Sequence, residues 1–398
     1  MDNHSRLRSG KKRTQIKKRV RRRSLFNALQ KLEDRHLLAF DISLFANINQ
    51  LGISSVPEEV TEVNGEVFFV ADDGRTGSEL WKTDGTEAGT VQVSDIFPGF
   101  EGSQPSQLTA LGNELFFVAL DEDNEFDLWK SDGTESGTVL VFDANANGVY
   151  YPTELTASGS RIFFTAYESA SGYELWSTDG TNAGTALVRD INPDQNIIDR
   201  PQELTDVNGT LFFTSYDDGY YNRELWKSDG TAAGTVLVKD IGVDLGDPGP
   251  DDDDFTISSN PYELTNINGT LYFVAEDFEN GVELFQSDGT SAGTSLVSDL
   301  NPGGSSSYPS GLTEFQGDVF FSATDGTGRH LYRSDGVTTS LVAITSASGS
   351  STPTDLTVVG NDLYFSSEGS VPVLDVAVDV PVLTPQNSIR TGSTTTLA

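Results

Sequence analysis

Carboxylates are the side chains through which this chain could do chemistry. It has 60 Asp and Glu against 25 Lys and Arg, no cysteine, and three histidines, of which His4 and His36 lie in the first 40 residues. Disulfides and thiolate chemistry are therefore excluded, and His330 alone completes no catalytic or metal-binding motif. Two carboxylates facing each other across a cleft would suffice for a glycosidase, but the sequence singles out no such pair.

Two acidic runs could hold a calcium ion, which needs several converging oxygen ligands. The first contains Asp121 and Asp123, and the second contains Asp251, Asp252 and Asp253. Each run also fits a solvated acidic loop, which is the simpler interpretation. Calcium is thus the one cofactor that the sequence suggests, without requiring it.

A short unit, Glu-Leu-Trp-Lys-Ser-Asp-Gly-Thr or a near copy, recurs along the chain. Its aspartates are Asp84, Asp132, Asp179, Asp229, Asp288 and Asp335, and its tryptophans are Trp81, Trp129, Trp176 and Trp226. Each copy has one carboxylate with Thr or Val two residues on, so we interpret the aspartate as a turn residue rather than a calcium ligand. The tryptophans could stack on sugars, but their equivalent positions in successive copies predict packing between units.

The spacing of the unit, 47 to 59 residues, is typical of a solenoid or a propeller. Each repeat contains four short segments with strand-like composition, in the fourth repeat 202–206, 210–215, 224–228 and 235–241. A pair of adjacent aromatics, such as Phe212 and Phe213, recurs in the second segment. Neighbouring residues on a strand point to opposite faces, so both faces of each sheet must be covered. Small antiparallel sheets packed around an axis satisfy this requirement and form a β-propeller.

The two ends of the repeat region predict how the ring closes. Residues 43–49 align without gaps on residues 295–301, a fourth strand, whereas the last copy ends after its second strand. Residues 371–378 could supply its third strand. We therefore predict an all-β, seven-bladed propeller of four-stranded antiparallel blades over residues 41–385, with its last blade closed by the N-terminal strand. An open β solenoid is the alternative fold. Residues 386–398 are expected to form a polar tail after the propeller.

Residues 1–40 differ sharply from the remainder in charge. They hold 13 Lys and Arg against 3 Asp and Glu, leaving 12 against 57 in the body of the chain. We expect a basic targeting segment that is disordered or removed. The acidic body disfavours nucleic acid and anionic membranes, and no apolar run is long enough for a transmembrane span.

Two stretches resemble known families. Residues 32–39, Leu-Glu-Asp-Arg-His-Leu-Leu-Ala, resemble the LEPRxLL-type amino-terminal export signal of planctomycete proteins, with Asp34 in place of the usual proline. Over residues 43–367 the chain resembles the ELWxxDGT repeat of bacterial exported proteins, most closely at 79–81, 174–176 and 224–226. The resemblance implies a repeat architecture and an exported, extracellular or cell-surface location. It supplies no catalytic residues.

A binding surface is expected where the repeats differ. In an antiparallel meander the loops after the second and fourth strands share one rim, and these loops vary in every repeat. The best candidate residues on this rim are Tyr216, Asp217, Asp218, Tyr220, Tyr221 and Arg223.

These observations favour a monomeric, exported or cell-surface, non-enzymatic propeller that serves as a binding scaffold for a glycan or a surface protein. Two alternatives stay open. One is a carbohydrate-active enzyme, a glycosidase or lyase, that uses paired carboxylates. The other is a structural surface or matrix component bridged by calcium.

Overall fold

The chain is organised as seven antiparallel sheets in sequence order. The computed structural model describes residues 46–49, 54–123, 125–193, 200–216, 223–242, 258–342, 352–367 and 373–375. Contacts divide the chain into Met1–Asn47 and Ile48–Ala398, and all the sheets lie in the second unit. Within the described ranges, no helix is long and apolar enough to cross a membrane.

The strands of the first four sheets are β1 (Glu58–Val63), β2 (Glu66–Asp72), β3 (Ser78–Thr83), β4 (Val91–Gln92); β5 (Ser106–Leu111), β6 (Glu114–Leu120), β7 (Phe126–Ser131), β8 (Val139–Phe142); β9 (Val149–Ser158), β10 (Arg161–Glu168), β11 (Gly172–Thr178), β12 (Ala186–Arg189); and β13 (Gln202–Val207), β14 (Thr210–Tyr216), β15 (Arg223–Ser228), β16 (Val236–Lys239). Those of the last three are β17 (Tyr262–Ile267), β18 (Thr270–Asp277), β19 (Gly281–Ser287), β20 (Ser295–Ser298); β21 (Ser310–Phe315), β22 (Asp318–Thr324), β23 (Arg329–Ser334), β24 (Thr339–Leu341); and β25 (Pro353–Val359), β26 (Asp362–Ser367), β27 (Val373–Asp375). Two short 3₁₀ helices lie at Asn145–Asn147 and Asn182–Gly184.

Each sheet is a meander in which every strand pairs with the next along the chain. The first and second strands of several sheets are joined by Asn-Gly, and both residues have positive φ, 54° at Asn208 and 82° at Gly209. That conformation matches the twist of a two-residue hairpin. The four strands predicted for the fourth repeat are confirmed, although β16 is shorter than expected.

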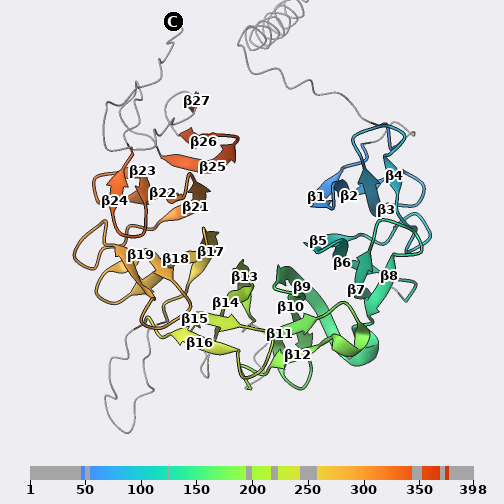
Figure 1. The fold of residues 1–398 in the computed structure, drawn as a ribbon, viewed down its shortest axis with the longest axis horizontal. Helices are drawn as coiled ribbons and strands as arrows, with labels where there is room; N and C mark the ends of the chain where they lie inside the picture. The colour runs from blue at the N-terminus through green and yellow to red at the C-terminus, as the bar shows by residue number, and fades with distance from the viewer. Residues whose placement is uncertain are drawn as a thin grey trace, which may run out of the picture. The chain divides into compact units, whose positions relative to one another are not determined.

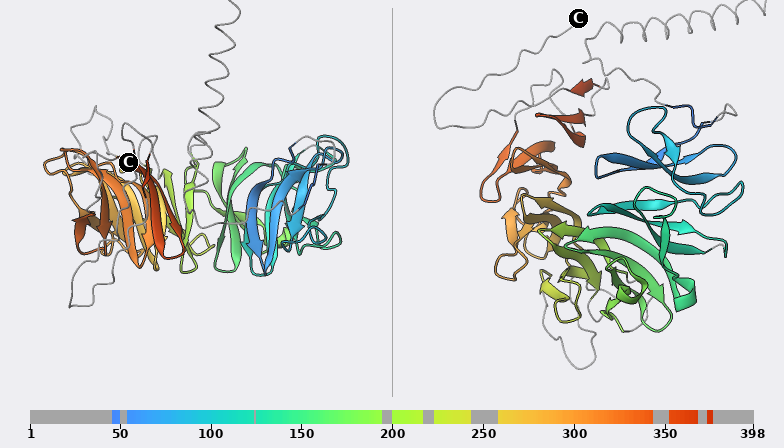
Figure 2. Two further views of the ribbon diagram at one scale, coloured as in Figure 1. Left: turned by 90° about the horizontal axis from the view of Figure 1, so that it is seen from above. Right: turned by 45° about the vertical axis from the view of Figure 1, so that its right-hand side comes forward.

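The sheets are arranged as the blades of a propeller. The first strand of each sheet contacts the first strand of the next, from β1 through β5, β9, β13, β17 and β21 to β25. These strands line the inside of the arrangement in Figure 1, and the left view of Figure 2 shows the sheets edge-on, with strands running between two rims. The all-β propeller prediction is confirmed.

Adjacent aromatics do pack on opposite faces of each blade. Phe213 lies in a core cluster with Phe163 and Trp226, between the third and fourth sheets. Phe212 lies instead in a cluster with Phe273, between the fourth and fifth sheets. Burial of each aromatic ring stabilises the fold by roughly 1.5–3 kcal/mol, so the pair fastens the fourth blade to both of its neighbours.

Trp176 and Trp226 belong to these cores, and Trp129 packs against one of them. Trp226 is 5% exposed, and its ring stacks on Phe213 with 6.5 Å between centroids. Phe285 and Tyr332 occupy the equivalent position and are also buried. Packing between units, rather than sugar stacking, is what the structure supports for this series.

The predicted closure is described in part. The third strand expected within 371–378 is present as β27, which pairs with β26. The predicted N-terminal closing strand begins at residues 43–45, which lie outside the described residues, and residues 46–49 form no strand. The basic segment 1–40 and the tail 386–398 also lie outside the described part of the chain.

Candidate functional site

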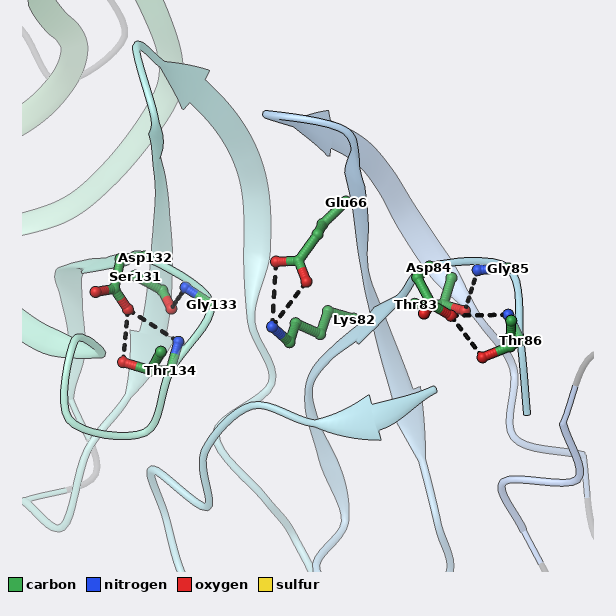
Figure 3. Close-up of polar contacts among 10 residues, drawn as sticks. All are labelled: Glu66, Lys82, Thr83, Asp84, Gly85, Thr86, Ser131, Asp132, Gly133 and Thr134. Atoms are coloured by element: carbon green, nitrogen blue, oxygen red, sulfur yellow. Dashed lines mark hydrogen bonds and ion pairs between the residues drawn. The ribbon is translucent and has the colours of Figure 1, made fainter. Parts of the chain in front are cut away.

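The Asp-Gly-Thr turn is held by its own side chains. Asp84 Oδ1 accepts hydrogen bonds from Thr86 N at 2.9 Å and Thr86 Oγ1 at 2.7 Å, and Asp132 makes the same bonds with Thr134 (Figure 3). These bonds lower the pKa of both aspartates. A Cβ on Gly89 would lie 2.0 Å from Asp84 Oδ1, so the carboxylate occupies the space that glycine leaves open. The structure supports the turn interpretation of the repeated aspartate.

The glycine that directly follows the turn aspartate lies against the preceding blade, as Gly133 shows. A Cβ on Gly133 would lie 3.1 Å from the ring of Phe68. Beside that ring, Lys82 Nζ pairs with Glu66 Oε1 at 2.9 Å (Figure 3). The turn therefore serves inter-blade packing as well as chain reversal.

The glutamate of the repeated unit is a buried anchor that the sequence analysis did not single out. Glu224 is 0% exposed and accepts bonds from Ser259 N at 2.8 Å and Ile241 N at 3.2 Å, as well as from Ser259 Oγ. Burial raises its pKa to about 7, against the opposing effect of these bonds. Burial likewise raises the pKa of the equivalent Glu79, Asp127 and Glu283 to about 7 and that of Glu174 to about 8. Each carboxyl fastens the loop that leads into the following blade.

A second set of side chains ties the blades together around the central opening. Each of the residues Glu59, Gln107, Glu154, Glu203 and Glu263 lies on a first strand with φ between 52° and 60°. Positive φ is uncommon for such residues, and it occurs here at a bulge where strand pairing shifts register. The bulge redirects the side chain toward the next blade.

There it meets the backbone of one apolar residue. Glu59 Oε2 accepts a bond from Leu108 N at 3.3 Å, and Thr61 Oγ1 donates to Leu108 O at 3.1 Å. Gln107 and Thr109 hold both backbone groups of Leu155 in the same way, at 3.1 Å each. We call this Glu/Gln-x-Thr arrangement the inter-blade clamp. It also gives a role to a threonine that recurs in the first strands, as Thr61, Thr109, Thr156 and Thr205.

The clamps border a cavity of about 730 Å³ formed by β1, β5, β9, β13 and Arg200, two residues before β13. Its charged lining residues are Glu59, Glu154, Glu203 and Arg200. Burial raises the pKa of Glu154, and the charge of Arg200 opposes this shift. The opening therefore has a polar wall with more carboxylates than guanidinium groups, contributed by four successive blades.

The predicted rim site is only partly described. Asp217, Asp218, Tyr220 and Tyr221 lie outside the described residues. The Arg223 guanidinium lies 4.7 Å from the Tyr216 ring centroid and donates to Thr214 Oγ1 at 2.7 Å and Arg200 O at 3.0 Å. Arg223 is 8% exposed, so it organises the rim from within and offers little surface to a ligand.

The predicted calcium ligands are likewise described in part. Asp251, Asp252 and Asp253 lie outside the described residues. Asp121 Oδ1 accepts a bond from Asp123 N at 2.9 Å, which closes a local turn. In the described portion of the chain, no three acidic or histidine side chains converge as a metal site.

A row of tyrosines on the third sheet was also missed. Tyr150 pairs with Tyr167, and Tyr167 pairs with Tyr173, across β9, β10 and β11. The signal in the sequence was Tyr150-Tyr151 directly before residues 152–156, Pro-Thr-Glu-Leu-Thr, with Tyr167 and Tyr173 on either side of the loop that follows the second strand. Their contact required the register of three strands.

Comparison with known proteins bears on the fold. No protein-family model matches the chain, and no curated protein matches it in sequence. Among solved structures, a prolyl endopeptidase matches with a TM-score of 0.46 and 13% identity, over 83% of this chain and 51% of that one. A puromycin-hydrolysing peptidase of Mycobacterium tuberculosis matches with 0.43 and 11%, over 81% and 51%. The β-propeller domain of the Trilobed protease from Pyrococcus furiosus matches with 0.43 and 10%, over 81% and 95%. This chain spans about half the length of the first two.

The comparison corrects the function expected from the sequence. We expected a non-enzymatic scaffold for a glycan or a surface protein, whereas the matched structures come from peptidases. The expectation was wrong because the repeated residues determine how the blades pack. None of them indicates the class of protein to which the propeller belongs. The resemblances to the ELWxxDGT repeat and the LEPRxLL signal, and the export that they imply, stay predictions.

Proposed function

We propose that this chain is a peptidase-related propeller that takes up positively charged, extended polypeptide substrate at its central opening. The observation that carries the proposal is the 730 Å³ cavity whose charged lining consists of three glutamates and one arginine. This volume lies within the range of ligand-binding pockets in proteins. An excess of carboxylates in a recess attracts cations and raises their local concentration.

The wall is suited to hold its shape as substrate enters. Clamp bonds join β1 to β5 and β5 to β9, and Glu203 and Thr205 join β13 to β17 through Leu264, at 3.3 and 3.2 Å. A site whose side chains are already fixed loses little conformational entropy on binding. Extended polypeptide also carries the backbone groups that a polar wall can pair.

The test uses a fluorescent peptide of alternating glycine and arginine, followed by anisotropy at low and high salt. We expect the double variant Glu154→Gln, Glu203→Gln to bind it about tenfold more weakly, because each exposed charge pair contributes up to about 1 kcal/mol. Gln107 occupies a clamp position in the native chain, so glutamine should preserve the clamp.

The matched control removes two glutamates from exposed turns, as Glu87→Gln, Glu135→Gln. Both residues lie in the turn between third and fourth strands, away from the first strands that form the opening. Equal weakening by the two double variants would contradict uptake at the opening. So would equal affinity for a glycine–glutamate peptide.

A further inference from the structure

Tyr150, Tyr167 and Tyr173 lie side by side on one face of the third sheet, at the rim where its loops vary. Ring centroids are 6.4 Å apart for Tyr150 and Tyr167, and 5.3 Å for Tyr167 and Tyr173. Tyr151 lies 6.4 Å from Tyr150. Tyr150 is 36% exposed and Tyr151 is 65% exposed. We call these four residues the tyrosine row.

The row exists because β9 is longer than its counterparts. It has 10 residues, against 6 in β5 and in β13. Val149 and Tyr150, at its N-terminal end, pair with the last two residues of β10. Glu154, which lines the central opening, lies on the same strand. The row therefore runs outward across the sheet from the strand that borders the opening.

The neighbouring blade shows which chemistry such tyrosines accept. Tyr216 in β14 takes the position that Tyr167 has in β10. The cross-strand partner of Tyr216 is Arg223, whereas the partner of Tyr167 is Tyr173. The Arg223 guanidinium lies over the Tyr216 ring, 4.7 Å from its centroid. In the third blade Tyr173 takes the position of that arginine. Tyr167 therefore has no arginine as its cross-strand partner.

We propose that the tyrosine row binds arginine side chains of the polypeptide that enters the central opening. The inference rests on the proposed function and names the residue type by which substrate is recognised. A guanidinium stacks on aromatic faces better than an ammonium group does, because it is planar and more weakly hydrated. Charge complementarity favours the same partner, since residues after 40 hold 57 Asp and Glu against 12 Lys and Arg.

The experiment compares glycine–arginine and glycine–lysine peptides of equal length and charge by anisotropy. The wild type should bind the arginine peptide more tightly. The variant Tyr150→Leu, Tyr151→Leu should lose about fivefold in affinity for the arginine peptide and less for the lysine peptide. Leucine preserves apolar bulk at both positions, and a thermal melt confirms that the variant is folded.

The matched control is Tyr150→Phe, Tyr151→Phe, which keeps both aromatic faces and removes the hydroxyls. It should retain the preference for arginine. Three results would overturn the inference: no preference in the wild type, a loss in the phenylalanine variant equal to that in the leucine variant, or binding of a neutral polysaccharide that the leucine variant abolishes.

The binding data distinguish an error in the tyrosine row proposal from an error in the proposed uptake at the central opening. If Glu154→Gln, Glu203→Gln weakens both peptides while the tyrosine variants change nothing, the row is refuted and uptake at the opening stands. If the tyrosine variants remove the arginine preference while the glutamate variants bind normally, the opening is refuted and the row stands.

Discussion

The buried glutamates make the stability of this propeller depend on pH, and Glu224 allows the effect to be isolated. Its pKa is raised from 4.5 to about 7, mainly by burial and to a smaller extent by the charge of nearby Asp240. Between these values the folded protein holds a proton that the unfolded chain has released. Raising the pH through this range therefore favours unfolding, and the free energy of unfolding falls.

The magnitude follows from the two pKa values. Integrating the difference in bound protons from about pH 5 to about pH 8 gives a loss of about 2–3 kcal/mol from this one group. Glu224→Gln removes the titration. It also leaves Ile241 N without the carboxylate oxygen that accepts its bond at 3.2 Å, which costs about 1–3 kcal/mol. The variant should be less stable than the wild type near pH 5 and about equal to it near pH 8.

Urea unfolding followed by tryptophan fluorescence at several pH values measures both effects. The expected result is a wild-type curve that falls with pH more steeply than that of Glu224→Gln, by about 2–3 kcal/mol over the whole range. Glu87→Gln controls for the loss of one negative charge at an exposed turn. A Glu224→Gln curve parallel to the wild type would refute the assignment of a buried, protonated anchor.

Two further predictions concern the backbone. Gly89→Ala should destabilise the protein by about 1–3 kcal/mol in thermal melts, because its Cβ would lie 2.0 Å from Asp84 Oδ1; a neutral result would contradict the tight turn. Gly311→Glu should be more stable than Gly311→Ala by about 0.5–1 kcal/mol. Gly311, at a φ of 69°, takes the clamp position of the sixth blade, a Cβ there meets only Leu356 Cδ1, at 3.7 Å, and both variants carry the same backbone strain. Gly311→Ala serves as its control, and equal stability of the two variants would argue against a clamp bond to Leu356.

The sequence predicts the blades well because each blade is built from one continuous stretch of the chain. One repeat of about 50 residues contains all the signals that predict a blade: strand alternation, the Asn-Gly turn and paired aromatics such as Phe212 and Phe213. The aromatic pair even predicts that both faces are covered, as the two core clusters confirm.

The candidate site was not predictable in the same way. The clamp joins Glu59 to Leu108, residues 49 apart, and depends on a positive φ at the bulge that no propensity of glutamate suggests. The tyrosine row depends on the register of three strands. These features arise between strands and between blades, where single-repeat patterns carry no information.

The most direct test of uptake at the opening is photo-crosslinking of an arginine-rich peptide, with the attachment sites located by mass spectrometry. We predict that attachment concentrates on the first strands β5, β9 and β13, around residues 107–109, 154–156 and 202–205. Attachment concentrated instead on the exposed turns around Glu87 and Glu135 would contradict the proposed function.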